Sequence, residues 1–283
     1  MLLHLGKLPY FVTIASAMLL HAPSLAADAS DWDGDSRAGI RLIAGNATTE
    51  TSGARLRAGL EIRLGQGWKT YWRYPGDSGV PPQFDFAASD NVKSVTVAWP
   101  APHRMPDSEG VTIGYTGGVV FPLRIEPSDP GKPVTLRLKF DYAICEKLCV
   151  PAQGQAELQV TGRGDAQQAA IAAADARVPQ PRALGADAAF AVKALRRDDS
   201  VKPARMLVDV AAPQGATVEL FAEGPSSDWA LPVPEAVAGA PAGMQRFAFA
   251  LDGLPPGTAG TGAEIKLTAA TAKDAIETTF RLD

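Results

Sequence analysis

Short runs that alternate apolar and polar residues dominate the chain from residue 38 to residue 160. In residues 56–64 apolar side chains occupy every even position and charged side chains most of the odd ones. A period of two is typical of a strand with one buried and one exposed face. Similar runs cover residues 92–99, 119–125, 134–144 and 155–160. Many short strands separated by glycine and proline turns predict an all-β fold built as a β-sandwich.

The pattern changes at Asp165–Val178, which is rich in alanine and free of glycine and proline. It predicts a short helix that begins at a capping aspartate and ends before Pro179. Residues 164–185 are therefore interpreted as a helix and a proline-containing linker. Strand-like runs then resume at residues 190–195, 206–210, 218–221, 247–251, 265–267 and 276–282. They predict a second β-sandwich domain over residues 186–283.

The first 26 residues resemble a secretory signal peptide. Lys7 supplies a positive charge, residues 11–20 form a short apolar run, and Ser24-Leu25-Ala26 is a small-residue cleavage site. The apolar run is shorter than the roughly 20 residues needed to span a membrane. We therefore expect a protein that is exported after cleavage at Ala26 and is not itself membrane-spanning. In such a compartment cysteines can persist as disulfides.

Charge and histidine content narrow the function classes. The chain has a net charge of −4 and no basic stripe, which argues against a nucleic-acid partner. Of its three histidines, only His103 lies beyond the predicted signal peptide. Histidine-rich metal sites are thereby excluded, and a Ser-His-Asp hydrolase would depend on one residue. We expect no cofactor.

The only two cysteines, Cys145 and Cys149, are separated by three residues and lie between two strand-like runs. By the alternation of residues 134–144, Cys145 belongs to the outer face of its strand. The connection from Cys145 to Gly154 is longer than the roughly two to five residues of a usual hairpin loop. A disulfide requires Cα atoms within about 7 Å, so residues 146–148 must turn if the pair is bonded.

Three interpretations of the pair remain open from its spacing. A structural disulfide would contribute only about 2 kcal/mol for so small a loop. A Cu(I) site would use both thiolates, with Met105 and His103 as further ligands. A redox-active dithiol would need two thiols within reach and partial exposure. The spacing differs from the CxxC of thioredoxins, and the pair lies between strands instead of at a helix start.

Three segments resemble the N-terminal periplasmic domain of the DsbD thiol:disulfide interchange reductases, especially the suppressor-of-copper-sensitivity branch. They are Gly67–Phe86 (GWKTYWRYPGDSGVPPQFDF), Trp99–Ile125 (WPAPHRMPDSEGVTIGYTGGVVFPLRI) and Leu138–Gln153 (LKFDYAICEKLCVPAQ). The resemblance covers roughly residues 38–160. It implies an immunoglobulin-like redox domain over residues 27–163, in the periplasm, with Cys145 and Cys149 as its catalytic pair.

The resemblance also implies a role for neighbouring residues. In the family a mobile cap loop shields the cysteines with an apolar side chain, and residues 103–110 align with that loop. His103 and Met105 are therefore the candidate cap residues, with Tyr142 beside the pair. Cys149 is expected to attack and Cys145 to resolve.

The family domain receives electrons from a membrane-embedded partner and passes them to periplasmic thioredoxin-like or disulfide isomerase proteins. This chain has neither a membrane domain nor a thioredoxin-like domain in its sequence. The resemblance thus implies a protein-disulfide reductase component whose membrane electron transporter is a separate chain. The alternatives are a periplasmic copper-binding or copper-tolerance protein and a non-enzymatic β-domain with a structural disulfide.

Overall fold

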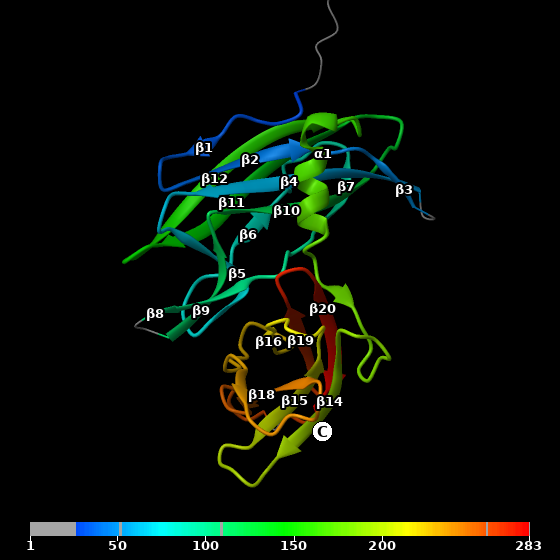
Figure 1. Ribbon diagram of the computed structural model, residues 1–283. Coiled ribbons are helices and arrows are strands. Elements are labelled where there is room, and N and C mark those ends of the chain that lie inside the picture. The colour runs from blue at the N-terminus through cyan, green and yellow to red at the C-terminus, as the bar shows by residue number, and fades with distance from the viewer. Residues whose placement is uncertain (1–26, 51–52, 108–109, 259, 283) are drawn as a thin grey trace, which may run out of the picture.

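The computed structural model describes residues 27–50, 53–107, 110–258 and 260–282. The predicted signal peptide lies outside the described residues. One helix and twenty strands make up the regular structure of the described part (Figure 1). The predicted all-β class is confirmed.

The N-terminal β region, strands β1 to β12, consists of two packed sheets. One sheet has the order β1-β2-β4-β10-β7, with β3 paired to β4, and the other has the order β12-β11-β5-β9-β8, with β6 paired to β11. The strands are β1 (Asp33–Gly34), β2 (Ala38–Ala44), β3 (Thr48–Glu50), β4 (Gly53–Leu64), β5 (Lys69–Gly76), β6 (Gln83–Asp85), β7 (Val92–Val97), β8 (His103–Asp107), β9 (Gly110–Thr116), β10 (Gly118–Pro127), β11 (Val134–Cys145) and β12 (Cys149–Val160).

The alternating residues form the core between these sheets. Even-numbered apolar residues of β4 and β11, such as Leu60, Ile62, Leu138 and Phe140, are buried in it. Odd-numbered residues of β11, such as Lys139, face outward. The period-two pattern therefore selected the buried face correctly. This arrangement is the immunoglobulin-like sandwich that the resemblance implied.

The C-terminal β region, strands β13 to β20, adds two four-stranded sheets with their own apolar core. Their orders are β13-β20-β19-β16 and β14-β15-β18-β17. The strands are β13 (Gln180–Pro181), β14 (Ala191–Asp198), β15 (Arg205–Ala211), β16 (Glu219–Glu223), β17 (Glu235–Val237), β18 (Met244–Ala250), β19 (Glu264–Ala270) and β20 (Ala275–Arg281). The sequence therefore indicated a second sheet-rich region correctly.

Helix α1 (Asp165–Asp175) links the two β regions and packs on the first one. Its single buried residue, Ile171, lies against Gly45, and Asp175 forms an ion pair with Arg57 of β4. The expected aspartate cap is wrong, because Gly164 occupies the capping position without a side-chain bond. Asp165 is the first helical residue, and its carboxylate accepts a hydrogen bond from Asn46 instead.

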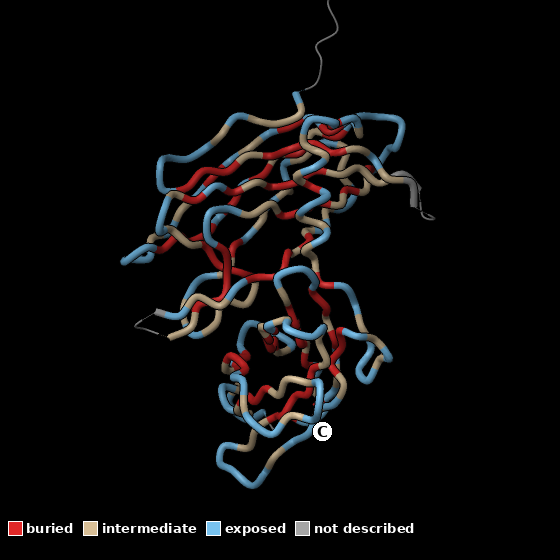
Figure 2. The backbone as a smooth tube through the Cα atoms, viewed as in Figure 1, coloured by how far each residue is buried: buried red, intermediate tan, exposed pale blue. Residues whose placement is uncertain are grey.

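The two β regions meet along strand β5 and the start of β8. Figure 2 shows buried chain at this junction as well as inside each region. The ring of Trp72, which is fully buried, lies 5.7 Å from that of Phe221. The Tyr74 hydroxyl donates to the carbonyls of Trp229 and Leu231, and burial raises the pKa of Tyr74 to about 12. The junction therefore has an apolar contact flanked by directional hydrogen bonds.

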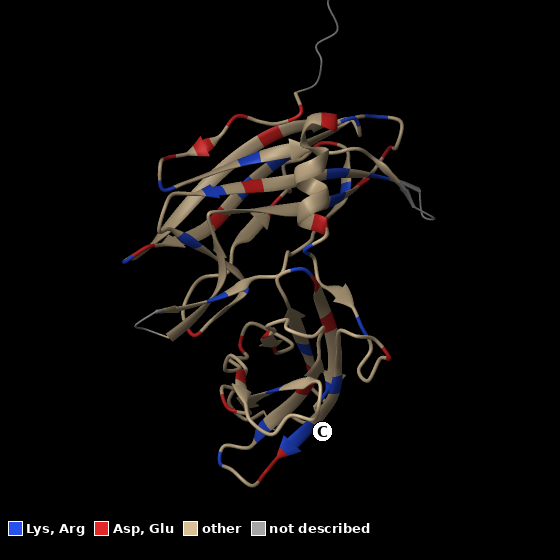
Figure 3. Ribbon diagram, viewed as in Figure 1, with Lys and Arg blue, Asp and Glu red and all other residues tan. Residues whose placement is uncertain are grey.

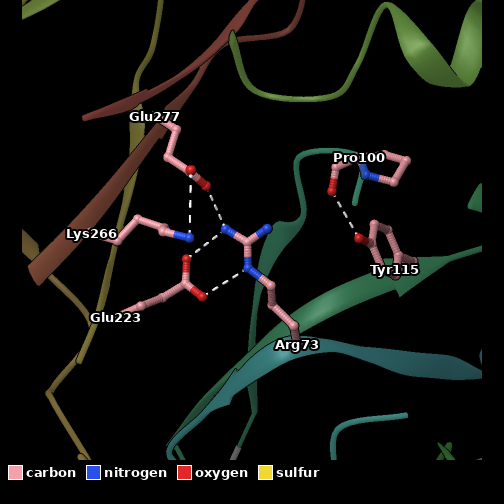
Figure 4. A network of polar contacts seen from close by, with 6 residues as sticks. All are labelled: Arg73, Pro100, Tyr115, Glu223, Lys266 and Glu277. Atoms are coloured by element: carbon pink, nitrogen blue, oxygen red, sulfur yellow. Dashed lines mark hydrogen bonds and ion pairs between the residues drawn. The ribbon is translucent and has the colours of Figure 1, made fainter. Parts of the chain in front are cut away.

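Arg73 forms the main charged contact of this junction. Its guanidinium binds Glu223 through two hydrogen bonds of 2.8 Å and Glu277 through one of 2.7 Å, and Lys266 also approaches Glu277 (Figure 4). Burial lowers the pKa of Arg73, but its bonds to the two carboxylates outweigh this effect and raise the pKa. Because Arg73 comes from β5 and both carboxylates from the C-terminal β region, the network ties the two regions together.

We expect Arg73→Met to destabilise the protein by about 2 kcal/mol, because it removes the charged hydrogen bonds to two partly buried carboxylates and leaves only Lys266 near Glu277. The measurement is the denaturant midpoint by tryptophan fluorescence. Arg137→Met is the matched control, since Arg137 also binds two carboxylates, Asp90 and Glu157, but on the exposed surface. The control should lose much less stability. Equal losses in the two variants would contradict the assigned role of the Arg73 network.

Candidate functional site

The two cysteines lie at the end of the β11–β12 hairpin, which projects from its sheet (Figure 1). Cys145 and Cys149 are opposite each other in the ladder, with their Cα atoms 4.1 Å apart, and their sulfurs form a disulfide. The turn between them is only Glu146-Lys147-Leu148. The long connection expected from the sequence is therefore wrong: pairing continues past Gly154 and Pro151 to the cysteines themselves.

The two sulfur-bearing residues differ sharply in exposure. Cys145 is only 6% exposed and clusters with Tyr71 and Ala143, whereas Cys149 is an exposed residue. Cys145 does alternate to the outer face, as its phase predicted, but it is buried there because neighbouring residues cover that face. A reagent from solvent therefore reaches Cys149 first.

Tyr71 of β5 is the polar neighbour of the disulfide. Its hydroxyl lies 3.0 Å from Cys149 Sγ, although the residue is only 1% exposed. The backbone of β5 brings it there: Lys69 and Thr70 pair with Cys145 and Ile144, and the Thr70 hydroxyl donates to the Ala143 carbonyl. A phenol can donate a hydrogen bond to a thiolate or a disulfide sulfur.

The segment after β5 covers the Tyr71 ring. Gly79 has a φ of +135°, and a Cβ atom there would lie 2.5 Å from two ring carbons of Tyr71. A larger residue would therefore displace either the segment or the ring. Asp77 fixes the same segment to β9, because Val111 donates to its carboxylate and the Asp77 N–H donates to the Val111 carbonyl.

The predicted cap residues lie elsewhere in the sheet. His103 and Met105 belong to β8, which β5 and β9 separate from β11. The His103 ring lies 3.2 Å from the Glu219 carboxylate of the C-terminal β region. Burial raises the pKa of Glu219, but hydrogen bonds from His103 and from the Arg104 backbone outweigh it and lower the pKa. Residues 108 and 109 of the predicted cap lie outside the described residues.

Tyr142 is close to the cysteines in sequence but faces the core. Its ring stacks on that of Phe140, with centroids 4.7 Å apart. Burial raises its pKa above the ordinary value. The aromatic residue that touches sulfur is therefore Tyr71, which sequence reasoning missed. The sequence signal for Tyr71 was its position in the Gly67–Phe86 segment of the family resemblance. The alternation of apolar and polar residues in that segment does not distinguish Tyr71 from Tyr74 as the residue that contacts the cysteines.

A shallow groove of about 510 Å³ lies over β11 on the same hairpin. Its walls are Val80 and Pro81 on one side and Pro151 to Gln153 on the other, with Gln83, Asp141 and Tyr142 completing the lining. We call it the hairpin groove. No group of three or more His, Cys, Asp or Glu side chains suited to a metal ion occurs in the part of the chain that the structure describes.

The geometry suits thiol exchange. An incoming thiolate can approach the exposed residue Cys149, while Cys145 is held within bonding distance as the leaving or resolving thiol. The hydroxyl of Tyr71 is positioned to stabilise negative charge on Cys149.

Comparison with known proteins agrees with this geometry. Residues 41–161 match the family model described as "Thiol:disulfide interchange protein DsbD, N-terminal". The chain also resembles the crystal structure of the N-terminal periplasmic domain of ScsB from Proteus mirabilis, with a TM-score of 0.67 and 19% identity over 90% of this chain and 98% of that one. None of the curated proteins matches the chain. The resemblance drawn from the sequence is confirmed.

We expect Tyr71→Phe to slow the alkylation of reduced Cys149 at neutral pH by about three- to tenfold, the effect of losing one hydrogen bond to the reactive sulfur. The measurement is iodoacetamide labelling followed by mass spectrometry. Tyr142→Phe is the control, because this variant also loses a buried phenolic hydroxyl, but Tyr142 lies on the core face of its strand. An equal slowing in both variants, or none in Tyr71→Phe, would remove the assigned role of Tyr71.

Proposed function

From the match of residues 41–161 to the DsbD N-terminal domain, we propose that this chain is a periplasmic thiol:disulfide interchange protein. Its Cys145/Cys149 pair accepts electrons from a membrane-embedded thiol transporter on a separate chain. It passes them to periplasmic thioredoxin-like or disulfide isomerase proteins. The proposal includes export by the N-terminal signal peptide, a redox domain at residues 27–163 and a second domain at residues 186–283.

The observation that carries the proposal is the unequal exposure of one bonded pair. A partner can attack Cys149, while Cys145 is accessible only within the molecule. A disulfide that served solely as a staple would not need one of its cysteines exposed at a hairpin end beside a phenol. Exposure and a polar neighbour are the features that make a thiol pair exchangeable.

The reaction is two successive thiol exchanges. In the reduced protein the Cys149 thiolate attacks one sulfur of an acceptor disulfide, forming a mixed disulfide and releasing the acceptor's other sulfur as a thiolate. Cys145 loses its proton to solvent and attacks Cys149. The intramolecular disulfide forms, and the acceptor leaves as a dithiol with two electrons gained. Reduction by the membrane donor runs through the same steps in reverse.

Two features of the chain bear on the partners. No helix in the described residues is long and apolar enough to cross a membrane. Acidic and basic side chains are interspersed over the ribbon, and the hairpin end carries one of each, Glu146 and Lys147 (Figure 3). Such a mixed surface fits a protein that meets several partners without one dominant charge pattern.

The copper-binding alternative has less support than thiol exchange. It would bring His103 or Met105 to the cysteines, but two strands, β5 and β9, lie between β8 and β11, and His103 contacts Glu219. The structural-disulfide alternative makes a different prediction for the reduction potential, which separates it from the proposed function.

We expect a reduction potential of about −180 to −270 mV for the Cys145/Cys149 pair, the range of proteins that exchange disulfides. The measurement is equilibration of the mature protein with glutathione or dithiothreitol buffers, followed by thiol alkylation. A potential below about −300 mV would identify a structural disulfide and contradict the proposal.

We expect the two single-cysteine variants to behave differently. Cys145→Ser retains the exposed attacking sulfur but lacks the resolving thiol, so it should accumulate a mixed disulfide with a thioredoxin-like acceptor. Cys149→Ser should lose reductase activity and trap no acceptor, because its remaining thiol is buried. Non-reducing electrophoresis with mass spectrometry identifies the adducts. Trapping by Cys149→Ser alone would reverse the two roles.

A further inference from the structure

The strand that carries Cys149 is the last strand of its sheet. In the order β12-β11-β5-β9-β8, one side of β12 pairs with β11, and no strand of the described residues pairs with its other side. In an antiparallel pair, residues alternate between those bonded to the neighbouring strand and those whose N–H and C=O groups point away from it. The residues of β12 whose N–H and C=O groups point away from β11 are therefore the ones that can form hydrogen bonds at its free edge.

Two observations fix this alternation. The Gln155 N–H donates to the Asp33 carboxylate instead of to β11, so Gln155 points away from its ladder partner. Cys145 and Cys149 have Cα atoms 4.1 Å apart, close to the roughly 4.5 Å of a pair that is not hydrogen-bonded and well below the 5.5 Å of a bonded one. Both observations place the backbone groups that point away from β11, here called the outward groups, at the odd-numbered residues 149, 151, 153 and 155.

The outward edge is open for a short length next to the sulfur. Asp33 covers it at Gln155. Between Cys149 and Gln153, no backbone hydrogen bond from another described segment reaches it. Cys149 and Gln153 each offer an N–H and a C=O, while Pro151 offers only its C=O. Unpaired edges of this kind accept an extended segment from another chain.

Apolar surface lies on the outer face of the same hairpin. The hairpin groove has Pro151 and Ala152 in one wall and Val80, which is 57% exposed, in the other. Leu148, 74% exposed, stands next to Cys149 in the turn. Cys149, Pro151 and Gln153 share one face of β12. Pro151 and Gln153 also line the groove, which lies over β11 on the side of β12 away from its free edge. A residue two positions from a partner's cysteine would lie about 7 Å from it, level with Pro151.

We propose that the edge from Cys149 to Gln153 docks an extended, cysteine-bearing segment of the redox partner by β-strand pairing. The partner's cysteine lies opposite Cys149, its backbone pairs with the outward groups of Cys149, Pro151 and Gln153, and an apolar side chain two positions away packs beside Pro151. This inference rests on the proposed function, because thiol exchange at Cys149 determines that the segment carries a cysteine. Main-chain pairing would let one site serve partners of different sequence.

Gln153 offers a clean test, because its N–H points away from β11. Gln153→Pro removes that donor without removing a β11–β12 hydrogen bond, and proline is tolerated at such edge positions. Gln153→Ala is the matched control, since it also loses the side-chain bond to Asp141 but retains the N–H.

The probe is a reduced six-residue peptide of alternating threonine and valine with one central cysteine, compared with the same peptide N-methylated along one edge and with glutathione. Each thiolate attacks Cys149 of the oxidised protein, forms a mixed disulfide and expels Cys145 as a thiolate. The reaction is quenched with acid, and mass spectrometry of the products gives the second-order rate constants. For each variant, the rate constant of a peptide is divided by that of glutathione, so any effect of the substitution on the reactivity of the disulfide itself cancels.

We expect the unmodified peptide to react with the wild type and Gln153→Ala about three- to tenfold faster than its N-methylated form. Gln153→Pro should lose most of that difference. Equal rates for the two peptides on the wild type, or equal peptide rates for Gln153→Pro and Gln153→Ala, would overturn the docking mode. Neither result alters the measured reduction potential, so failure of this inference is distinguishable from failure of the proposed function.

Discussion

The register of the β11–β12 ladder is the constraint on which the rest of the site depends. Every residue from Val134 to Cys145 has a partner in β12, ending with Cys145 opposite Cys149. A slip of one residue would exchange the two faces of the strand. Phe140 and Tyr142 would leave the core, and the two cysteines would no longer face each other. The apolar core of the sandwich therefore fixes the position of the disulfide.

Strand β5 connects this disulfide to the C-terminal β region. Within five residues it supplies Thr70, which bonds the β11 backbone, Tyr71, which reaches Cys149, and Arg73 and Tyr74, which bind the C-terminal β region. Trp72, between them, contacts Phe221. The contacts of this junction hold one part of β5 and so limit how far Tyr71 can shift relative to the sulfur on the other. This gives the second region a structural reason to be present beside a small redox pair.

Much of the fold was readable from the sequence, because half-buried strands leave a period of two in the chain. Leu60 and Phe140 were assigned to the core by that period. The end of the hairpin was not predicted, because Gly154 and Pro151 are residues typical of loops. Pro151 nevertheless fits in β12, because its nitrogen lies on the free edge of the strand, where no hydrogen bond to β11 is lost. The contact between Tyr71 and Cys149 joins residues 78 positions apart, and local pattern carries no information about it.

The same ladder explains how the disulfide can open without unfolding the protein. Closing so short a loop contributes only about 2 kcal/mol by constraining the unfolded chain. The hairpin is already held by its ladder and by the core residues that alternate along β11, such as Leu138 and Phe140. Loss of the covalent bond therefore removes a small part of what fixes the two strands. Oxidised and reduced forms can share one fold, so the free energy of the exchange depends on the two sulfurs and their neighbours, Tyr71 first among them.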